Sequence, residues 1–451
     1  MQERRENLLI SKRINKNKFQ YSEERKTNLL QKKYLKFCLE LIFILLIVSG
    51  GLKALERAKY LPVYDSDEVS WIFTGYYFNL YFLHFDLFHE DWNDYEAFDQ
   101  PPLAKYIVGG TIFLNGYTID SIEPKRFINT MVPLTNPQKA FDLVTPKVPN
   151  PKVVIPSSRS VIFGFALSSL LLIYIFLRTS YGILPAFITT SLIVSNPIFS
   201  LISTRILADP ILLFFFALLI LLFALYLKSQ RNIYIVLAFI VSSLAFLTKL
   251  NGILSVFLLI TFFLVDKKFS ISKNDWRYLI TGFIVFLIIS VLLNPVFLNT
   301  GIKAIWKMFE VRWSAFRVYQ ETWKSVALLS ISERFLIATK MIFFKYSIFY
   351  QLIRVPVELI LFGAGIYYTF RRKELLLILI FAFLVVIPIS ILPFNIPRYF
   401  YWIFPFIYII VGLSSNFFKE MVSKKNLELL KTIISPFGKW HISGNKGNQG
   451  E

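Results

Sequence analysis

Residues Pro210–Leu227 read PILLFFFALLILLFALYL, a run without a single charged side chain. An α-helix rises about 1.5 Å per residue, so roughly 20 residues cross the hydrocarbon core of a bilayer. The run begins directly after Asp209 and ends directly before Lys228, so charges lie at both of its ends. This stretch predicts a helix that spans a membrane.

Apolar runs of this kind recur along the whole chain. The 451 residues are 55% hydrophobic and only 17% charged, whereas a soluble domain usually has about 25% charged residues. We therefore predict an all-α polytopic membrane protein with about ten transmembrane helices. The expected spans are residues 35–55, 160–177, 183–202, 210–227, 233–248, 252–265, 278–293, 355–370, 375–393 and 400–416.

The distribution of charge predicts the orientation of these spans. The net charge is +20, and basic residues gather near both ends of the chain and in short turns. Cytoplasmic loops of membrane proteins carry an excess of Lys and Arg. We expect a cell-membrane protein with both termini in the cytoplasm and no nucleic-acid partner. The inner connections are then 178–182, 228–232, 266–277 and 371–374, each with Lys or Arg beside the membrane.

Cysteine usage excludes two kinds of site. The single cysteine, Cys38, lies in the first apolar run, so neither a disulfide framework within the chain nor a cysteine-based metal site is possible. The first run follows a long basic stretch, and no small-residue cleavage site follows it convincingly. We expect a signal anchor rather than a cleaved signal peptide.

Two long connections on the outer side suggest the domain organisation. They are 56–158 and 294–354, and each lies between apolar runs. We expect four parts: a basic cytoplasmic segment 1–34, a membrane module 35–265 with the first outer loop, a second module 266–418 with the second outer loop, and a cytoplasmic tail 419–451.

The first outer loop is acidic in an otherwise basic protein. Between Tyr64 and Asp99 there are nine acidic residues and no Lys or Arg. Aromatic residues follow Asp67 and Glu68 at spacings of three and four, which predicts a helix lying along the membrane surface. Acidic residues at a helix start are favourable through the helix dipole alone, so helix capping is the alternative to a catalytic role.

Four further polar features belong to the same outer side. Pro101–Pro102 precede Lys105, which we place in the first turn of a second surface helix, at the level of the lipid headgroups. Three polar clusters interrupt apolar runs, and ionisable residues at membrane depth usually face a cavity or a partner. The clusters hold Arg205 and Asp209, which are four residues apart and could pair, then Lys249 and Asn251, then Arg398 and Tyr399.

These residues together suit chemistry on a sugar carried by a lipid phosphate. Cations at Lys105, Arg205, Lys249 and Arg398 would stabilise the phosphate as it leaves. A carboxylate would take the proton of the acceptor hydroxyl. The sequence has no glycine-rich phosphate loop after a strand, which argues against a nucleotide-sugar donor.

A divalent cation site in the first outer loop is an alternative reading of its acidic residues. Carboxylates and imidazoles can hold such an ion, but the spacing matches no specific site, so we predict a hydrated acidic loop and no cofactor. The residues concerned are His84, Asp86, His89, Glu90, Asp91 and Asp94.

In order and spacing, the motifs resemble the protein O-mannosyltransferase family. They also resemble, more loosely, the lipid A aminoarabinose transferase. Both belong to the glycosyltransferase C superfold. The resemblance covers roughly residues 35–265, with weaker support at 394–405. Its motifs are Asp67–Glu68, Pro101–Lys105 (PPLAK), Arg205–Asp209 (RILAD), Thr248–Gly252 (TKLNG) and Arg398–Tyr399.

The resemblance implies roles for individual residues. Asp67 would be the catalytic base and Glu68 its neighbour in the acceptor site. The donor would be a polyprenyl- or dolichyl-phosphate sugar, with a mannose-like hexose that inverts at its anomeric carbon, and no metal would be required. The chain departs from the family at Gln100, where a histidine is usual, and at Leu250, where an aromatic is usual.

The expected function is thus an integral membrane glycosyltransferase in which 35–265 is the catalytic module. It would move the sugar to a hydroxyl of a protein or glycolipid acceptor on the outer face. Two alternatives stay open: a transporter or flippase for lipid-linked sugars, and an inactive scaffold. Transporters often show inverted repeats, and no repeat is visible in the sequence.

Overall fold

A computed structural model of the chain describes residues 34, 38, 40–58, 66–126, 145–268, 272–322, 324, 327–328, 330–392 and 395–434. The chain forms two compact units, Met1–Ala54 and Leu55–Glu451. In the first unit, residues 40–54 are helical. Most of the basic segment 1–34 and the end of the predicted tail lie outside the described residues. The boundary expected at residue 266 stays a prediction.

Every element of the described part of the second unit is a helix, so the all-α fold class is confirmed. From residue 160 onward, each expected span coincides with a helix or a group of consecutive helices. These are α8 (Pro151–Ser180), α9 (Ile183–Ser195), α10 (Pro197–Ser203), α11 (Asp209–Ser229), α12 (Ile233–Thr248), η4 (Leu250–Ile253), α13 (Leu254–Asp266), α14 (Lys273–Leu292), α19 (Val357–Arg372), α20 (Leu375–Phe381), η6 (Ala382–Val386), α21 (Ile387–Ser390), α22 (Pro397–Phe400) and α23 (Phe404–Ile434).

Fewer of these helices are long enough to span a membrane than the sequence suggests. In the part of the chain that the structure describes, α8, α11 and α14 pass by length and composition, and the pair α9 and α10 makes a fourth if the two count as one span. That pair is bent by 67°, where Pro197 follows Asn196 and the helix restarts. The number of about ten spans stays a prediction.

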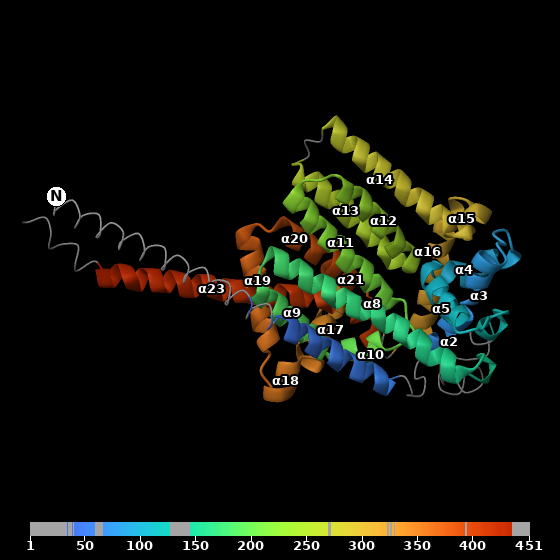
Figure 1. Cartoon of the computed structure of the whole chain (residues 1–451), viewed down its shortest axis with the longest axis horizontal. Helices are drawn as coiled ribbons and strands as arrows, with labels where there is room; N and C mark the ends of the chain where they lie inside the picture. The colour runs from blue at the N-terminus through green and yellow to red at the C-terminus, as the bar shows by residue number, and fades with distance from the viewer. Residues whose placement is uncertain are drawn as a thin grey trace, which may run out of the picture. The chain divides into compact units, whose positions relative to one another are not determined.

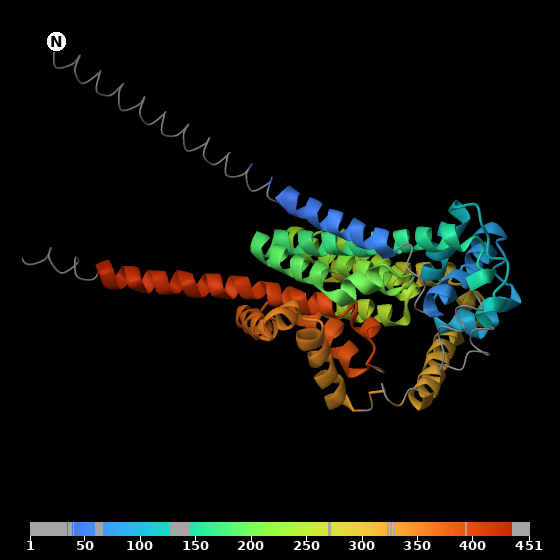
Figure 2. The same ribbon diagram turned by 90° about the horizontal axis from the view of Figure 1, so that it is seen from below.

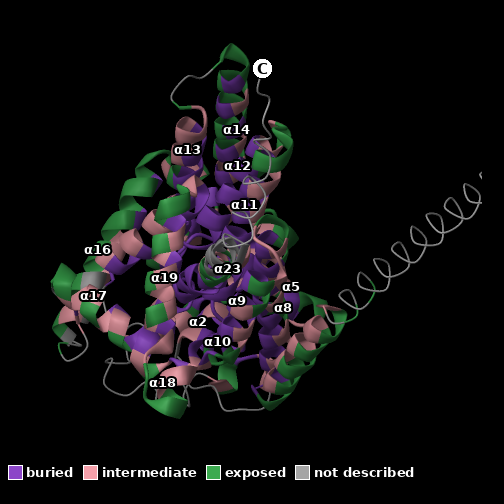
Figure 3. Ribbon diagram, turned by 90° about the vertical axis from the view of Figure 1, so that its left-hand side faces the viewer, coloured by how far each residue is buried: buried purple, intermediate pink, exposed green. Residues whose placement is uncertain are grey.

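The core is a bundle in which helices pack side by side in the order α14, α12, α11, α8, α9, α23, α19 (Figure 1). Close approach depends on small residues: a Cβ on Gly365 of α19 would lie 1.9 Å from the carbonyl oxygen of Ile410 in α23. Buried residues gather in α9, α11 and α12, whereas α14 and α16 carry exposed residues (Figure 3).

Short helices gather at one end of the bundle, which we call the loop end (Figure 1). They come from both predicted outer loops and meet beside the start of α8 and the end of α14. They are α2 (Ser66–Phe73), α3 (Tyr76–Phe78), η1 (Asn79–Leu83), η2 (Glu90–Asn93), α4 (Tyr95–Asp99), α5 (Leu103–Leu114), η3 (Thr145–Lys147), α15 (Pro295–Thr300) and α16 (Lys303–Thr322). The second loop also forms α17 (Ile331–Lys340), η5 (Met341–Lys345) and α18 (Ile348–Ile353).

The expected surface helix after Asp67 is broken, and much of it is buried. The break falls at Thr74–Gly75, between α2 and α3. A Cβ on Gly75 would lie 3.0 Å from the Cα of Gly109 in α5, so α5 packs directly against the break. Tyr77 is fully buried, and it therefore packs in the protein rather than anchoring a helix at the membrane surface.

The last helix is longer than the sequence analysis predicts. The apolar run ends at residue 416, but α23 continues to Ile434. Residues after 416 are rich in Lys, Leu and Glu, which have good helix propensity, so hydropathy marks the end of the apolar run and not the end of the helix.

Candidate active site

Asp67 lies in the first turn of α2, and its carboxylate forms an ion pair with the Nη1 atom of Arg398 in α22. The Asp67 side chain is 37% exposed and that of Arg398 is 22% exposed. The Arg398 guanidinium also lies 5.4 Å from the ring centre of Tyr399. The fold thus joins the first and the last of the predicted motifs in one partly accessible pair.

Glu68, the next residue, is fully buried in a network of donors. Arg159 of α8 donates from Nε and from Nη2, each at 2.9 Å. Arg205 donates from Nη1 at 3.0 Å, and the backbone N–H of Ile206 donates at 3.0 Å. Protein donors thus surround the carboxylate, and the place of Glu68 in the acceptor site stays a prediction.

Asp209 and Lys249 form a second buried pair, 2.8 Å between Oδ1 and Nζ. The spacing of Arg205 and Asp209 in the sequence allowed an ion pair between them. In the structure, Arg205 pairs with Glu68 and Asp209 pairs with Lys249. The partner of Asp209 comes from the turn between α12 and η4. That turn is tight: a Cβ on Gly252 would lie 2.0 Å from the carbonyl oxygen of Ala245, so only glycine fits there.

Lys105 does not lie at the surface as the sequence analysis predicts. It is 2% exposed, donates to the carbonyl oxygen of Glu96 at 2.6 Å, and lies 4.9 Å from the ring centre of Tyr77. Burial lowers the pKa of Lys105 to about 7, although Asp99 and Glu96 act in the opposite direction. The Lys105 side chain points inward, where the Glu96 carbonyl of α4 and the Tyr77 ring of α3 contact its ammonium group. Its binding to a phosphate stays a prediction.

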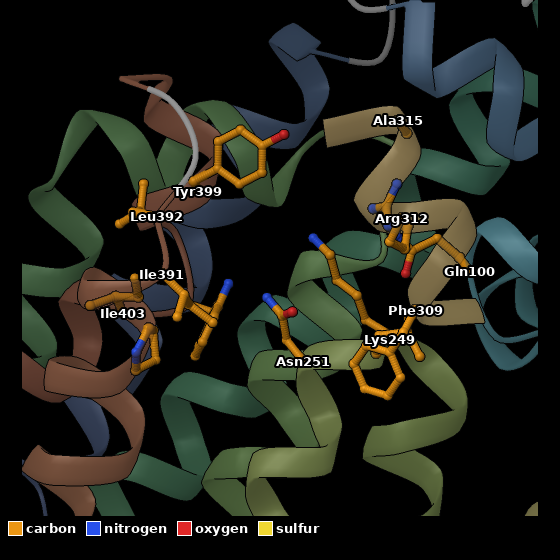
Figure 4. A pocket seen from close by; sticks show the side chains of 13 residues that line it. Gln100, Lys249, Asn251, Phe309, Arg312, Ala315, Ile391, Leu392, Tyr399 and Ile403 are labelled. Carbon is orange, nitrogen blue, oxygen red and sulfur yellow. The ribbon is translucent and has the colours of Figure 1, made fainter. Parts of the chain in front are cut away.

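A pocket of about 240 Å³ opens at the loop end, beside these pairs. Figure 4 shows Lys249 and Asn251 between a wall with Ile391, Leu392 and Tyr399 and a wall with Gln100 and Arg312. Asp67 is connected to the pocket by two consecutive residues: Tyr399 lines the pocket, and Arg398, directly before it, pairs with Asp67. Its remaining lining residues are Leu250, Phe309, Ala315, Pro388, Trp402 and Ile403.

Arg312 of α16 is a site residue that the sequence reasoning missed. Its Nη1 atom lies 2.7 Å from Oδ1 of Asp99, and its Nε donates at 3.0 Å to the amide oxygen of Gln100 in the orientation that satisfies both groups. Burial alone would raise the pKa of Asp99, but the charges of Arg312, Lys125 and Lys105 lower it. In the sequence, Arg312 lies in the second predicted outer loop, which has no recognisable motif. Gln100, where the chain departs from the family pattern, was the only signal for this part of the site.

Acidic side chains of the first predicted outer loop are paired with a basic side chain of the protein. Arg126 pairs with Asp91 at 2.8 Å and also contacts Asp94 and Glu123. Burial and the Asp91 carboxylate raise the pKa of Tyr76, which donates to Asp91 at 2.8 Å. Within the described residues, no group of three or more His, Cys, Asp or Glu side chains is placed to hold a metal ion.

Comparison with known proteins identifies the fold class of the chain. The family model described as dolichyl-phosphate-mannose-protein mannosyltransferase matches residues 153–294. ArnT from Cupriavidus metallidurans bound to undecaprenyl phosphate superposes with a TM-score of 0.54 at 14% identity, over 89% of this chain and 66% of that one. The chain has the glycosyltransferase C fold. The resemblance to the mannosyltransferases is confirmed for the matched segment.

Two further structures agree with this glycosyltransferase C fold. ArnT in the apo state gives a TM-score of 0.52 at 15% identity, over 90% of this chain and 66% of that one. The oligosaccharyltransferase AglB from Archaeoglobus fulgidus, in complex with an inhibitory peptide and a dolichol-phosphate, gives 0.50 at 13% identity, over 91% and 52%. The chain therefore spans about two thirds of the ArnT chain and about half of the AglB chain. No curated protein matches the sequence.

The mannosyltransferase segment, 153–294, contains only part of the site. It supplies Arg159, Arg205, Asp209 and Lys249, whereas Asp67 and Arg398 lie outside it. The site is thus assembled from the matched segment and from the two loop regions that flank it. The roles of Asp67 and Arg398 in the reaction stay predictions.

Proposed function

We propose that this protein is an inverting membrane glycosyltransferase that uses a lipid-phosphate sugar. It moves a mannose-like hexose from a polyprenyl- or dolichyl-phosphate donor to a hydroxyl of a protein or glycolipid on the outer face. The observation that carries the proposal is the partly exposed Asp67–Arg398 pair beside a pocket with Lys249, Asn251 and Arg312. The site thus combines a carboxylate with fixed cations.

The pocket suits the phosphate of the donor. Lys249 and Arg312 line it from different elements, the η4 turn and α16. Each also pairs with a carboxylate, Asp209 or Asp99, which fixes its direction. A guanidinium has five N–H donors, so Arg312 can hold Asp99 and still donate to a phosphate. Asn251, which also lines the pocket, adds a neutral donor beside Lys249.

Asp67 is the proposed base of the reaction. Its carboxylate takes the proton of the acceptor hydroxyl as the hydroxyl oxygen bonds to the anomeric carbon. The bond from that carbon to the phosphate oxygen breaks, and the electron pair leaves with the lipid phosphate. Arg312, Lys249 and Arg398 stabilise the charge that develops there. A phosphate needs no general acid to leave, and attack opposite to it inverts the anomeric carbon.

Glu68, Arg159 and Arg205 are proposed as positioning residues. Glu68 follows Asp67 directly in α2, so the buried donors that hold Glu68 also fix the backbone at Asp67. Arg205 precedes α11, whose first residue Asp209 orients Lys249. One network therefore connects the base to the donor pocket.

Sugar transfer by the purified protein is the direct test. The parent and Asp67→Asn are compared in detergent with a panel of polyprenyl-phosphate sugars and an acceptor extract. Removal of a positioned base lowers the rate by about a hundredfold or more. Asp120→Asn is the matched control, since Asp120 is an exposed carboxylate of the same loop outside the pocket, and it should retain the parental rate.

The other outcomes decide against parts of the proposal. Equal rates for the parent and Asp67→Asn would remove Asp67 as the base. Binding of polyprenyl phosphate without transfer from any donor would reject the enzyme in favour of a transporter or a scaffold.

A further inference from the structure

Helix α16 carries an exposed apolar stripe that its packing does not explain. The stripe consists of Ile302, directly before the helix, and of Ile305, Trp306, Phe309 and Trp313, at spacings of three and four residues that place them on one face. Trp306 is 76% exposed and Trp313 is 58% exposed. Exposed tryptophans on one helix are typical of a surface that contacts lipid at the edge of a membrane.

The opposite face of α16 attaches the helix to the protein. Ala304 and Met308 are fully buried, and α16 packs on α4 and α15. Lys307 lies 4.1 Å from the ring centre of Phe98 in α4, and Arg312 pairs with Asp99 at the end of α4. The stripe is therefore held rigidly and faces away from the helices that support it. Figure 2 shows α16, in gold, standing out from the same side of the bundle as α17.

The stripe is continuous with the pocket. Phe309 belongs to both, since it is exposed on the stripe and also lines the pocket. Ile391, 56% exposed, lies on the opposite wall (Figure 4). The pocket thus offers polar groups at Lys249, Asn251 and Arg312, and the exposed apolar side chains of Phe309 and Ile391 lead from it to the surface. This order of surfaces matches an amphiphile with an anionic head and an apolar tail.

We propose that the α16 stripe, with Ile391 across the pocket, holds the first isoprene units of the donor's lipid chain. This inference rests on the proposed function, because it assigns the tail of the same donor. With the phosphate between Arg312 and Lys249, the chain leaves past Phe309 and runs along Trp306 and Trp313. From Ile302 to Trp313 the stripe is about 16 Å long. A free phosphate or a soluble sugar nucleotide has no apolar chain that would contact this stripe.

Donors of different chain length test this assignment. Transfer is measured with a long polyprenyl-phosphate sugar and with a short-chain isoprenyl analogue that carries the same sugar. In the double variant Trp306→Ser/Trp313→Ser, kcat/KM for the long donor should fall by roughly tenfold more than for the short one, as expected for the loss of a large apolar contact. Val318→Ser is the matched control. Val318 is 55% exposed on the same helix, about 140° around it from Trp313, and the ratio of the two donors should stay at the parental value.

Two results would overturn the proposal: an unchanged ratio in the double variant, or an equal loss with both donors. The milder variant Trp306→Phe/Trp313→Phe, which keeps the apolar area, should restore the parental ratio and shows that the effect does not come from misfolding.

A second experiment keeps this inference distinct from the proposed function. A polyprenyl phosphate with a photoreactive group near its head is crosslinked to the parental protein in detergent, without any sugar transfer. Labelling within residues 302–313 that excess unlabelled polyprenyl phosphate prevents, and inorganic phosphate does not, supports the assignment. Labelling confined to other helices rejects the stripe. If transfer fails with every donor but 302–313 is labelled, the proposed function is wrong while the lipid surface stands.

Discussion

The guanidinium of Arg159 donates two hydrogen bonds to the carboxylate of Glu68, both 2.9 Å long, and both side chains are fully buried. The two residues are 91 positions apart in the chain. Bidentate pairs of this kind fix direction as well as distance. The pair therefore attaches α2, and with it Asp67, to the start of α8.

Removal of Arg159 should destabilise the protein strongly. Arg159→Ala leaves the buried Glu68 carboxylate with fewer donors, and breaking a buried pair costs about 3–5 kcal/mol. Thermal unfolding in detergent measures this loss. The double variant Glu68→Gln/Arg159→Met, which removes both charges, should recover much of the stability. A loss below about 1 kcal/mol in Arg159→Ala would contradict a supporting role for the pair.

Two variants at Lys249 distinguish its contribution to stability from its contribution to donor binding. Lys249→Met leaves the Asp209 carboxylate buried without the Nζ atom at 2.8 Å, so both stability and transfer should fall. Lys249→Met/Asp209→Asn removes the buried charge as well and should recover the thermal stability but not the transfer rate. Full recovery of both would mean that Lys249 has only a structural role.

Arg312 should act mainly on the donor. Arg312→Ala removes a cation from the pocket wall, and the loss of one charge-assisted hydrogen bond of roughly 1.5–3 kcal/mol corresponds to a KM for the donor raised by about tenfold to a hundredfold. Steady-state kinetics with varied donor concentration measure it. Lys303→Ala, an exposed cation of the same helix away from the pocket, should leave KM unchanged. A fall in kcat with constant KM would contradict a donor-binding role.

Arg398 should affect both the base and the phosphate. In the structure it pairs with Asp67, and the proposed reaction also uses it beside the leaving group. Arg398→Ala should lower kcat by more than tenfold, since transition-state charge stabilisation by one donor is typically larger than that. Arg398→Lys keeps the charge and should recover part of the rate. Equal rates for Arg398→Ala and the parent would exclude Arg398 from the reaction.

The buried Lys105 predicts how stability depends on pH. Burial lowers its pKa to about 7 in the folded protein, whereas an unfolded lysine titrates near about 10.4. Between these values the unfolded chain binds more protons, so the free energy of unfolding rises with pH. Thermal unfolding should therefore occur at higher temperature near about pH 9 than near about pH 7. Lys105→Met should weaken this dependence, while Lys125, whose pKa burial also lowers, keeps part of it. The same pH dependence in Lys105→Met as in the parent would contradict the lowered pKa of Lys105 as its source.

The sequence determined the helices and the polar motifs of this protein. Runs such as Pro210–Leu227 form helices wherever they lie in a membrane, because the backbone must satisfy its own hydrogen bonds there. The motif residues Lys249 and Arg398 could be singled out because charges that interrupt apolar runs are costly and need a partner. Asp67 could be singled out because it lies in an acidic loop of a basic protein. Neither conclusion required knowledge of which helices meet.

Only the tertiary structure decided which charges are partners. Spacing in the sequence suggested Arg205 with Asp209, but the fold brings Glu68 and Lys249 to them from 137 and 40 residues away. Spacing shows neighbours within one helix, whereas these pairs form between helices whose packing depends on contacts such as Gly75 against Gly109. The places of Lys105 and Arg312 also follow from that packing. Lys105 is buried where its Nζ atom donates to Glu96 of α4, and Arg312 lines the pocket where it pairs with Asp99 at the end of the same helix.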